Sequence, residues 1–180
     1  MSLAGKRVAV LVEQLYQEME VWYPVYRLRE AGCAVELVGP EAGKTYPSKL
    51  GYPAKATLAA KDARAADFAA VVIPGGFSPD YIRRSEPMLK LVHDALSQNK
   101  PVAAICHGPW VLCSRLFPQG ETPLKGRKVT CFHSIKDDVQ NAGGVYVDQE
   151  VVADGNIITS RTPEDLPAFV VALMDLMGKG

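Results

Sequence analysis

The architecture of this chain is indicated most clearly by the segment Val102-Ala103-Ala104-Ile105-Cys106-His107-Gly108-Pro109. Its first four residues are small or apolar, which is typical of a strand covered on both faces of a sheet. Gly108 and Pro109 then open a helix, so we expect Cys106 at the turn between the strand and the helix. Open α/β sheets bind ligands at this edge, beyond the carboxyl ends of their strands. The segment therefore predicts a parallel sheet and a candidate functional residue together.

The same turn has the pattern of a nucleophile elbow. Ala104 and Gly108 stand two residues before and after Cys106, and small residues there permit a sharp, strained turn. The N-terminus of the following helix favours a thiolate, which predicts a pKa below the usual value of about 8.5 for Cys106. The alternative is a small buried side chain that ends a strand. The pattern favours a reactive thiol at Cys106, whereas we expect the other cysteines to be packing residues, namely Cys33, Cys113 and Cys131.

Further strands and helices alternate on either side of this segment. Apolar runs predict central parallel strands at residues 7–12, 68–73 and 101–105. Apolar residues at helical spacing predict a helix through Met19, Trp22, Tyr23 and Tyr26, and a second through Leu89, Val92 and Leu96 with Ser85 as its N-cap. Strands that alternate with helices indicate a mostly parallel sheet with helices on both faces. Residues 41–60 are expected to be irregular, with a small ribbon.

The C-terminal part predicts a hairpin followed by a helix. Asp154-Gly155 lies between two strand-like runs, residues 146–153 and 157–160, and is expected to add antiparallel strands at one margin of the sheet. The last helix has Thr162 as its N-cap and Pro163 at its first position. Its apolar stripe is expected to cover the sheet and consists of Leu166, Phe169, Val170, Leu173 and Met177.

Composition restricts the function classes. The 180 residues, 48% of them hydrophobic, fit one domain over residues 1–180. Twenty basic and twenty acidic side chains cancel, so charge implies no affinity for nucleic acid. We find no signal-peptide or membrane-spanning run and expect a cytoplasmic protein with four free thiols. Three histidines without finger-like cysteine spacing argue against a structural zinc site, and we expect no bound metal.

A second signal follows another predicted strand. In Ile73-Pro74-Gly75-Gly76, two glycines allow backbone N–H groups to approach a ligand closely. Those groups, with the N–H of His107, are candidates for an oxyanion hole. The alternative is an ordinary turn, and the motif gains weight because the strand ending at Cys106 is expected next to it.

Several motifs together resemble the ThiJ/PfpI family, within the class I glutamine amidotransferase-like superfamily. The resemblance covers essentially the whole chain, and the histidine directly after the cysteine points to the branch of PfpI intracellular proteases and YhbO-type stress proteins. The motifs are Ile105-Cys106-His107-Gly108-Pro109, Ile73-Pro74-Gly75-Gly76, Gln17-Glu18-Met19-Glu20, Lys136-Asp137-Asp138 with Asn141-Ala142-Gly143, and Thr159-Ser160-Arg161-Thr162-Pro163.

This resemblance implies a fold and a site. The fold is a flavodoxin-like three-layer α/β sandwich, assembled as a homodimer or a hexamer. Glu20 matches the glutamate that hydrogen-bonds the cysteine sulfur, and Pro24 places it near an irregular, accessible point of its helix. Asp80 matches an acid that reaches the histidine of an adjacent subunit, where protease-like members carry glutamate; alternatively it is a plain helix-start aspartate. His133 matches a pocket residue near the cysteine, or simply ends a strand.

The leading hypothesis is a cysteine-dependent stress-response enzyme, deglycase-like or glyoxalase-like. Cys106 adds to an α-oxoaldehyde or to its adduct on a protein or nucleotide, and water releases a hydroxy acid, with no cofactor needed. Peptide hydrolysis by the same residues ranks second, because a compact domain leaves little sequence for the walls of a peptide groove. A redox sensor or holdase chaperone is the non-enzymatic alternative. The absence of a late His-x-Glu pair argues against glutamine amidotransferase chemistry.

Overall fold

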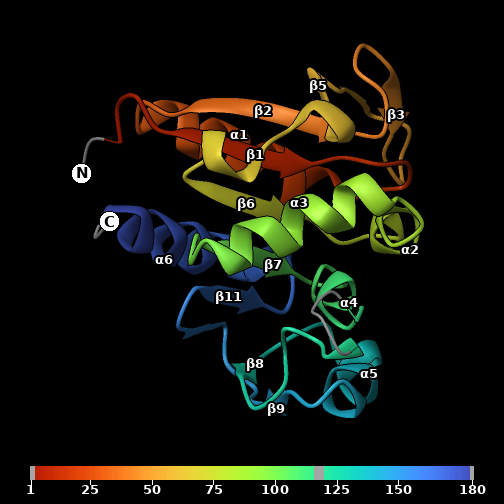
Figure 1. The fold of residues 1–180 in the computed structure, drawn as a ribbon, viewed down its shortest axis with the longest axis vertical. Helices are drawn as coiled ribbons and strands as arrows, with labels where there is room; N and C mark the ends of the chain where they lie inside the picture. Colours follow the sequence, from red (N-terminus) through yellow and green to blue (C-terminus); the bar gives the residue numbers. More distant parts are fainter. Residues whose placement is uncertain (1–2, 116–119, 179–180) are drawn as a thin grey trace.

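The chain folds around a seven-stranded sheet in the computed structural model, which describes residues 3–115 and 120–178 (Figure 1). The strand order is β10-β11-β7-β6-β1-β2-β5. Neighbouring strands run parallel except β10, which pairs antiparallel with β11. The strands of this sheet are β1 (Arg7–Leu11), β2 (Ala34–Gly39), β5 (Leu58–Ala59), β6 (Ala70–Ile73), β7 (Val102–Ile105), β10 (Val151–Asp154) and β11 (Ile157–Ser160).

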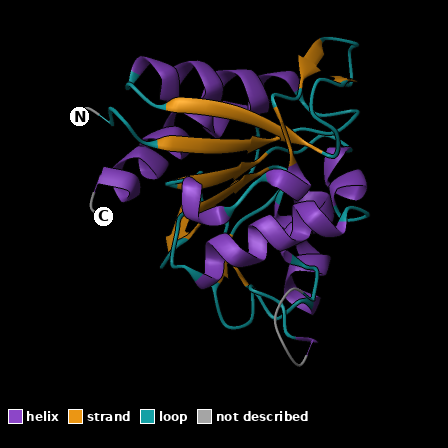
Figure 2. Ribbon diagram, turned by 45° about the horizontal axis from the view of Figure 1, so that its top comes forward, coloured by secondary structure: helices purple, strands orange, loops and turns teal. Residues whose placement is uncertain are grey.

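Helices cover both faces of the sheet (Figures 1 and 2). Helices α1 and α6 share one apolar core with the sheet, and α3, α4 and α5 share the other. The resulting three layers are a flavodoxin-like α/β fold, as predicted. The helices are α1 (Glu18–Glu30), α2 (Ser78–Ile82), α3 (Glu86–Ser97), α4 (Pro109–Leu112), α5 (Lys136–Asn141) and α6 (Leu166–Gly178), with short 3-10 turns η1 (Ala60–Asp62), η2 (Ala65–Asp67), η4 (His133–Ile135) and η5 (Pro163–Asp165).

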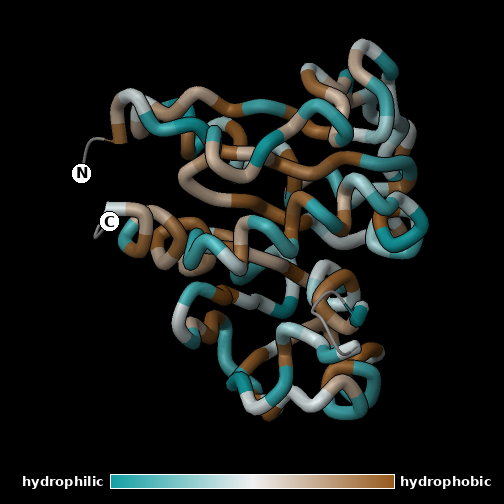
Figure 3. The backbone as a smooth tube through the Cα atoms, in the orientation of Figure 1, coloured by the Kyte–Doolittle hydropathy of each residue, from teal (hydrophilic) through white to brown (hydrophobic). Residues whose placement is uncertain are grey.

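Strand β1 shows how continuous apolar runs serve two cores at once. Val8 and Val10 pack toward α1 and α6, while Ala9 and Leu11 pack toward the opposite layer, because successive side chains of a strand point to opposite faces. Each fully buried valine or leucine contributes roughly 1.5–3 kcal/mol relative to exposure. Figure 3 shows hydrophobic colour along much of the central strands and hydrophilic colour in many of the surrounding loops.

The three predicted central strands are confirmed, and the predicted hairpin is confirmed in part. Strand β10 is the antiparallel strand at the margin, but β11 pairs parallel with β7, in a register that sets Ser160 beside Ile105. The hairpin turn therefore returns the chain into the parallel sheet. This register matters for the site, because β11 ends next to the turn that carries Cys106.

Helix α1 is present where its pattern predicted it, but its buried face is a different one. Met19 and Tyr26 are 52% and 57% exposed, whereas Val21, Val25 and Leu28 are fully buried. Aliphatic side chains fill the space against the sheet, and amphipathic aromatic side chains keep a polar tip in water. The aromatic residues therefore indicated the helix correctly but not the side that faces the core.

The other predicted helices agree closely with the structure. All five predicted residues of the last helix are buried in α6, although its first turn is the separate 3-10 turn η5 that follows Thr162. Ser85 occupies the N-cap position of α3, without a capping side-chain hydrogen bond. Within the described ranges, none of the helices is long and apolar enough to cross a membrane.

Two small ribbons complete the fold. Strands β3 (Thr45–Pro47) and β4 (Pro53–Lys55) form the antiparallel ribbon expected within residues 41–60. Their connecting turn docks on the start of α1, where the Glu18 carboxylate accepts hydrogen bonds from the Ser48 hydroxyl and from the Leu50 N–H at 2.8 Å. The second ribbon joins β8 (Lys128–Val129) and β9 (Val145–Tyr146) in parallel.

Candidate active site

Cys106 lies between β7 and α4 with a φ of +61°, in the left-handed region. This conformation costs a non-glycine residue about 1–2 kcal/mol, so the surrounding structure has to impose it. The Cys106 N–H donates to the Ser160 carbonyl at 3.0 Å, and the Cys106 carbonyl accepts from the Phe132 N–H at 2.9 Å. A Cβ on Gly108 would lie 2.5 Å from the Ile73 oxygen, so only glycine fits there. The predicted elbow is therefore present.

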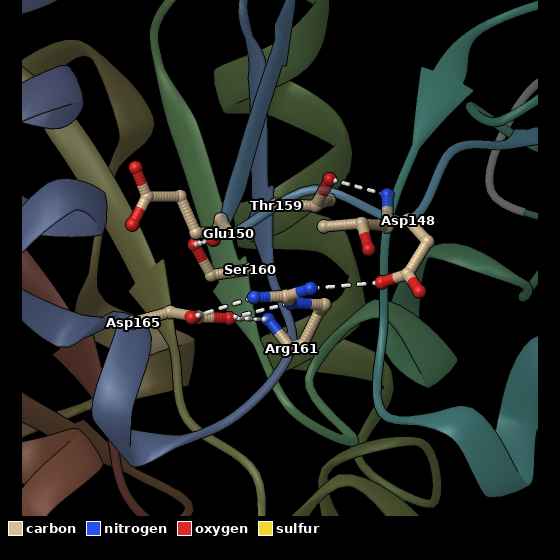
Figure 4. Close-up of polar contacts among 7 residues, drawn as sticks. Asp148, Glu150, Thr159, Ser160, Arg161 and Asp165 are labelled. Carbon is tan, nitrogen blue, oxygen red and sulfur yellow. Dashed lines mark hydrogen bonds and ion pairs between the residues drawn. The ribbon is translucent and has the colours of Figure 1, made fainter.

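The end of β11 that supports this elbow is fixed by side chains (Figure 4). The Thr159 hydroxyl accepts a hydrogen bond from the Thr130 N–H at 2.9 Å, and the Ser160 hydroxyl donates to the Glu150 carbonyl at 2.7 Å. Both contacts immobilise the segment whose carbonyl holds the Cys106 N–H.

Arg161 extends the same support (Figure 4). Its guanidinium makes two hydrogen bonds to Asp165, at 2.9 and 3.1 Å, and one to Asp148 at 2.8 Å. Asp165 is 6% exposed and also accepts the Arg161 backbone N–H. Because this pairing spans the turn from β11 to α6, it fixes the chain directly after Ser160.

The Pro-Gly-Gly loop after β6 packs tightly against the elbow. The Gly75 N–H donates to Glu20 Oε2 at 2.7 Å, and a Cβ on Gly75 would lie 2.8 Å from the His107 nitrogen. Gly76 has a φ of +70° and forms an isolated antiparallel β-bridge with Tyr16. The backbone N–H groups of Gly76 and His107 both lower the pKa of the Cys106 thiol. The predicted donors therefore converge on the thiol.

Glu20 is completely buried in the first turn of α1, where the Gln17 side chain caps its N–H at 3.1 Å. The expectation of an accessible site at an irregular helix is wrong, because α1 runs unbroken through Pro24. Desolvation raises the pKa of Glu20 to about 7, although bonds from Gly75 and Cys106 act in the opposite direction. Among the described residues Glu20 Oε1 has no hydrogen-bond partner, so this oxygen is available to accept the proton of the neighbouring thiol.

The prediction of a lowered pKa for Cys106 is also wrong. Burial and the Glu20 carboxylate raise the pKa of this thiol to about 12, against the smaller effect of the two backbone N–H groups. Helix α4 has only four residues, so its dipole is a weak source of positive potential. Above about pH 7 Glu20 and Cys106 therefore hold one proton between them, and a thiolate forms when Glu20 takes it.

His107 lies beside the sulfur and is held from both ring nitrogens. Nδ1 is 3.3 Å from Cys106 Sγ, and Nε2 is 3.2 Å from the Ser134 hydroxyl. The ring stacks on Phe132 with centroids 4.9 Å apart. Burial, followed by the charges of Lys49 and His133, lowers the pKa of His107, so the imidazole is neutral at neutral pH.

Ser134 and Lys49 are site residues that sequence reasoning missed. Ser134 lies in the turn η4, directly after His133, and a single serine in a turn carries no pattern that indicates a site. Lys49 lies in the turn between β3 and β4, and its charge lowers the pKa of both Glu20 and His107. Only a tertiary contact brings that turn to the site, so no local pattern could have indicated it.

His133 and Asp80 lie at the margin of the site. His133 is exposed and packs against Phe132, with ring centroids 4.3 Å apart. Asp80 in α2 forms an ion pair with Arg84, which lies in the turn after the helix, and the Asp80 side chain is 47% exposed. Its contacts within the chain do not include His107, so its predicted role depends on a second subunit. In the described residues, no group of three His, Cys, Asp or Glu side chains is arranged to hold a metal.

The other cysteines lie in the apolar cores as predicted. Cys33 and Cys131 are buried, Cys113 is partly buried, and all are free thiols. Burial raises the pKa of Cys113 and of Cys131 to about 12. What distinguishes Cys106 is therefore its surroundings: an acid, an imidazole and two N–H groups directed at one sulfur, which suits addition to an electrophilic carbonyl.

Comparison with known proteins covers nearly the whole chain. A model of the DJ-1/PfpI family matches residues 6–176. Protein/nucleic acid deglycase 2 of Escherichia coli is 39% identical over 97% of this chain and 99% of its own length. General stress protein 18 of Bacillus subtilis is 39% identical over 92% of this chain and 94% of its own length. A solved two-domain protein of Anabaena variabilis, with DJ-1/ThiJ/PfpI-like and ferritin-like domains, gives a TM-score of 0.90 at 40% identity, covering 96% of this chain and 48% of that one.

Proposed function

The chain belongs to the DJ-1/PfpI family, and from this we propose that it is a cysteine-dependent stress-response enzyme that converts α-oxoaldehydes, or their adducts, to hydroxy acids. The observation that carries the proposal is the surroundings of Cys106, where Glu20, His107 and two backbone N–H groups meet one thiol. Relatives named as a deglycase and as a general stress protein support the same reading.

The chemistry follows from these positions. Glu20 takes the thiol proton, and the Cys106 thiolate adds to the aldehyde carbon to form a hemithioacetal. The N–H groups of Gly76 and His107 stabilise the oxyanion, and Gly75 holds Glu20 in place. Glu20 returns its proton to the oxyanion and then carries a proton from the former aldehyde carbon to the neighbouring carbon. The hydroxyl proton passes to the neighbouring carbonyl oxygen, which leaves the thioester of a hydroxy acid. Water hydrolyses the thioester to the hydroxy acid and restores the thiol.

Other parts of the proposal concern residues and partners around this centre. His133 contributes to the substrate pocket, and Asp80 supports the His107 of a neighbouring subunit in a homodimer or hexamer. The substrates are small carbonyl compounds or glycated proteins and nucleotides, and the reaction needs no cofactor. Residues 1–180 act as one domain, and the enzyme works in the cytoplasm.

The test is product analysis with methylglyoxal. We expect wild-type protein to consume methylglyoxal and to release lactate, and Cys106→Ser to do neither while its circular dichroism spectrum is unchanged. Cys113→Ser is the matched control and should retain activity. Unchanged turnover in Cys106→Ser would overturn the proposal.

The same preparation separates the alternatives. A cysteine peptidase would hydrolyse peptide substrates in a Cys106-dependent way without releasing lactate from methylglyoxal. A holdase would prevent aggregation of an unfolded client equally well in wild type and Cys106→Ser. A redox sensor would lose its response in that variant but would show no multiple turnover in either form.

A further inference from the structure

The two ring nitrogens of His107 have different partners. Nδ1 is 3.3 Å from Cys106 Sγ, and Nε2 is 3.2 Å from Ser134 Oγ. Stacking on Phe132 holds the ring plane between them. Because the ring is neutral at neutral pH, one nitrogen carries a proton and the other accepts one. The partners therefore determine which tautomer is present.

The sulfur side indicates a proton on Nδ1. The Cys106 thiol has one proton, and the Glu20 carboxylate packed beside it at Gly75 is a stronger acceptor than an imidazole nitrogen, so we expect Glu20 to take that proton. The sulfur is then free to accept a hydrogen bond from Nδ1–H. In the thiolate state, the same N–H is directed at the developing negative charge, so its orientation suits both states.

The opposite side of the ring agrees with this tautomer. In this tautomer Nε2 carries a lone pair and accepts a hydrogen bond, which the Ser134 hydroxyl can donate. A carboxylate in that place could only accept, and it would move the proton to Nε2. Ser134 and a direct bond from Asp80 to Nε2 therefore predict opposite tautomers of His107, so the support from Asp80 in the proposed function has to be indirect.

We propose that Ser134 is a positioning residue that holds His107 as the Nδ1–H tautomer, so that His107 donates a hydrogen bond to the Cys106 sulfur. This inference deepens the proposed function and rests on it for the catalytic consequence alone. Ser134 touches neither the sulfur nor a carbonyl substrate. It acts by directing a third N–H at the thiolate, besides the two backbone groups.

The first measurement is nitrogen NMR of the histidine rings in wild type, Ser134→Ala, Ser134→Thr and Asp80→Asn. We expect the Nδ1–H form of His107 in wild type, in Ser134→Thr, which keeps a hydroxyl, and in Asp80→Asn. Ser134→Ala should shift the ring toward the Nε2–H form. Carboxymethylation of Cys106 at pH 7 should be about three- to tenfold slower in Ser134→Ala, as expected for one lost hydrogen bond to the thiolate.

A purely structural role of Ser134 would leave the tautomer of His107 unchanged in Ser134→Ala. We expect Ser134→Ala to lower kcat for methylglyoxal by the same factor with KM unchanged, and Ser134→Thr to restore it. An Nε2–H ring in wild type, or a tautomer unchanged in Ser134→Ala, would overturn the inference. So would a change of tautomer in Asp80→Asn. The NMR and alkylation measurements need no carbonyl substrate, so they stand even if the proposed reaction fails.

Discussion

At the scale of single residues, the site depends on one buried acid. Glu20 is fully buried, and its pKa of about 7 reflects desolvation that a single N–H bond from Gly75 and contact with the thiol do not offset. Such a group suits proton transfer at neutral pH, because it can both accept and release a proton there. The same burial makes the ionised form costly for the fold.

This cost predicts the pH dependence of stability. The pKa of Glu20 is about 7 in the folded protein, against an ordinary value of 4.5 for a glutamate in water, so the folded chain binds the proton more tightly than the unfolded chain. The resulting stabilisation is complete below the unfolded pKa and is lost as pH rises through the folded pKa, by roughly 3 kcal/mol in total. Glu20→Gln removes this loss, so relative to wild type it should gain stability between pH 5 and pH 8.

Urea unfolding of both proteins at pH 5 and pH 8 measures this difference. Glu30→Gln, at the exposed end of the same helix, should follow wild type. An equal difference in the free energy of unfolding between Glu20→Gln and wild type at both pH values would refute the assigned pKa. The variant should also be inactive, which makes Glu20 an example of stability traded for function.

At the scale of elements, the site is made where loops approach more closely than ordinary side chains allow. The loop after β6 contains Gly76, whose φ is +70° and whose added Cβ would lie 2.7 Å from the Gln17 nitrogen. Strand β11 and the elbow are joined by one backbone hydrogen bond from Cys106 to Ser160. The geometry of the thiol is therefore set by backbone positions.

Gly76→Ala tests the approach of this loop. Backbone strain of about 1–2 kcal/mol and displacement of the loop should lower both stability and activity, the latter by about 10²-fold through loss of an oxyanion donor. Gly43→Ala is the matched control, since Gly43 has a φ of +79° but open space around it. Gly43→Ala should lose stability through backbone strain but keep full activity. Equal activity in the two variants would contradict the role of the loop.

The support of β11 gives a second prediction at this scale. Arg161→Ala leaves the buried Asp165 without its guanidinium and should cost about 3 kcal/mol of unfolding free energy. Asp148→Ala removes only the outer ion pair, whose carboxylate is 70% exposed, and should cost less than about 1 kcal/mol. Denaturant titrations compare them, and similar losses in both variants would argue against the bidentate contact as the main support.

At the scale of the whole molecule, most of the fold could be predicted from the sequence. Continuous apolar runs indicated β1, β6 and β7, because strands buried on both faces cannot alternate in polarity. The buried face of α1 could not be predicted in the same way, since two stripes have helical spacing: the aromatic one that ends at Tyr26, and the aliphatic one that is buried and consists of Val21, Val25 and Leu28. The pairing of β11 with β7 was also hidden, because a hairpin signal specifies one neighbour of a strand and not the other.

The site was predictable where a motif carried it. Cys106, His107 and the two glycines occupy local patterns, and they are adjacent in space because neighbouring parallel strands end at one edge. The pKa of Cys106 was misjudged, since the sequence shows a helix start but neither its short length nor the depth of burial. Ser134 and Lys49 come from turns whose position only tertiary packing determines.

One comparison across the whole chain tests directly whether Cys106 is the reactive nucleophile: the rates at which iodoacetamide labels each of the four thiols at pH 7.5, resolved by peptide mass spectrometry. Accessibility alone favours Cys113, which is partly exposed, over Cys106, which is 8% exposed. Burial raises the pKa of both thiols to about 12, so the difference has to come from the neighbours of Cys106. We expect Cys106 to be labelled first, at least about tenfold faster than Cys113, because Glu20 can accept its proton as the thiol attacks. Labelling of Cys113 at an equal or higher rate would contradict this assignment.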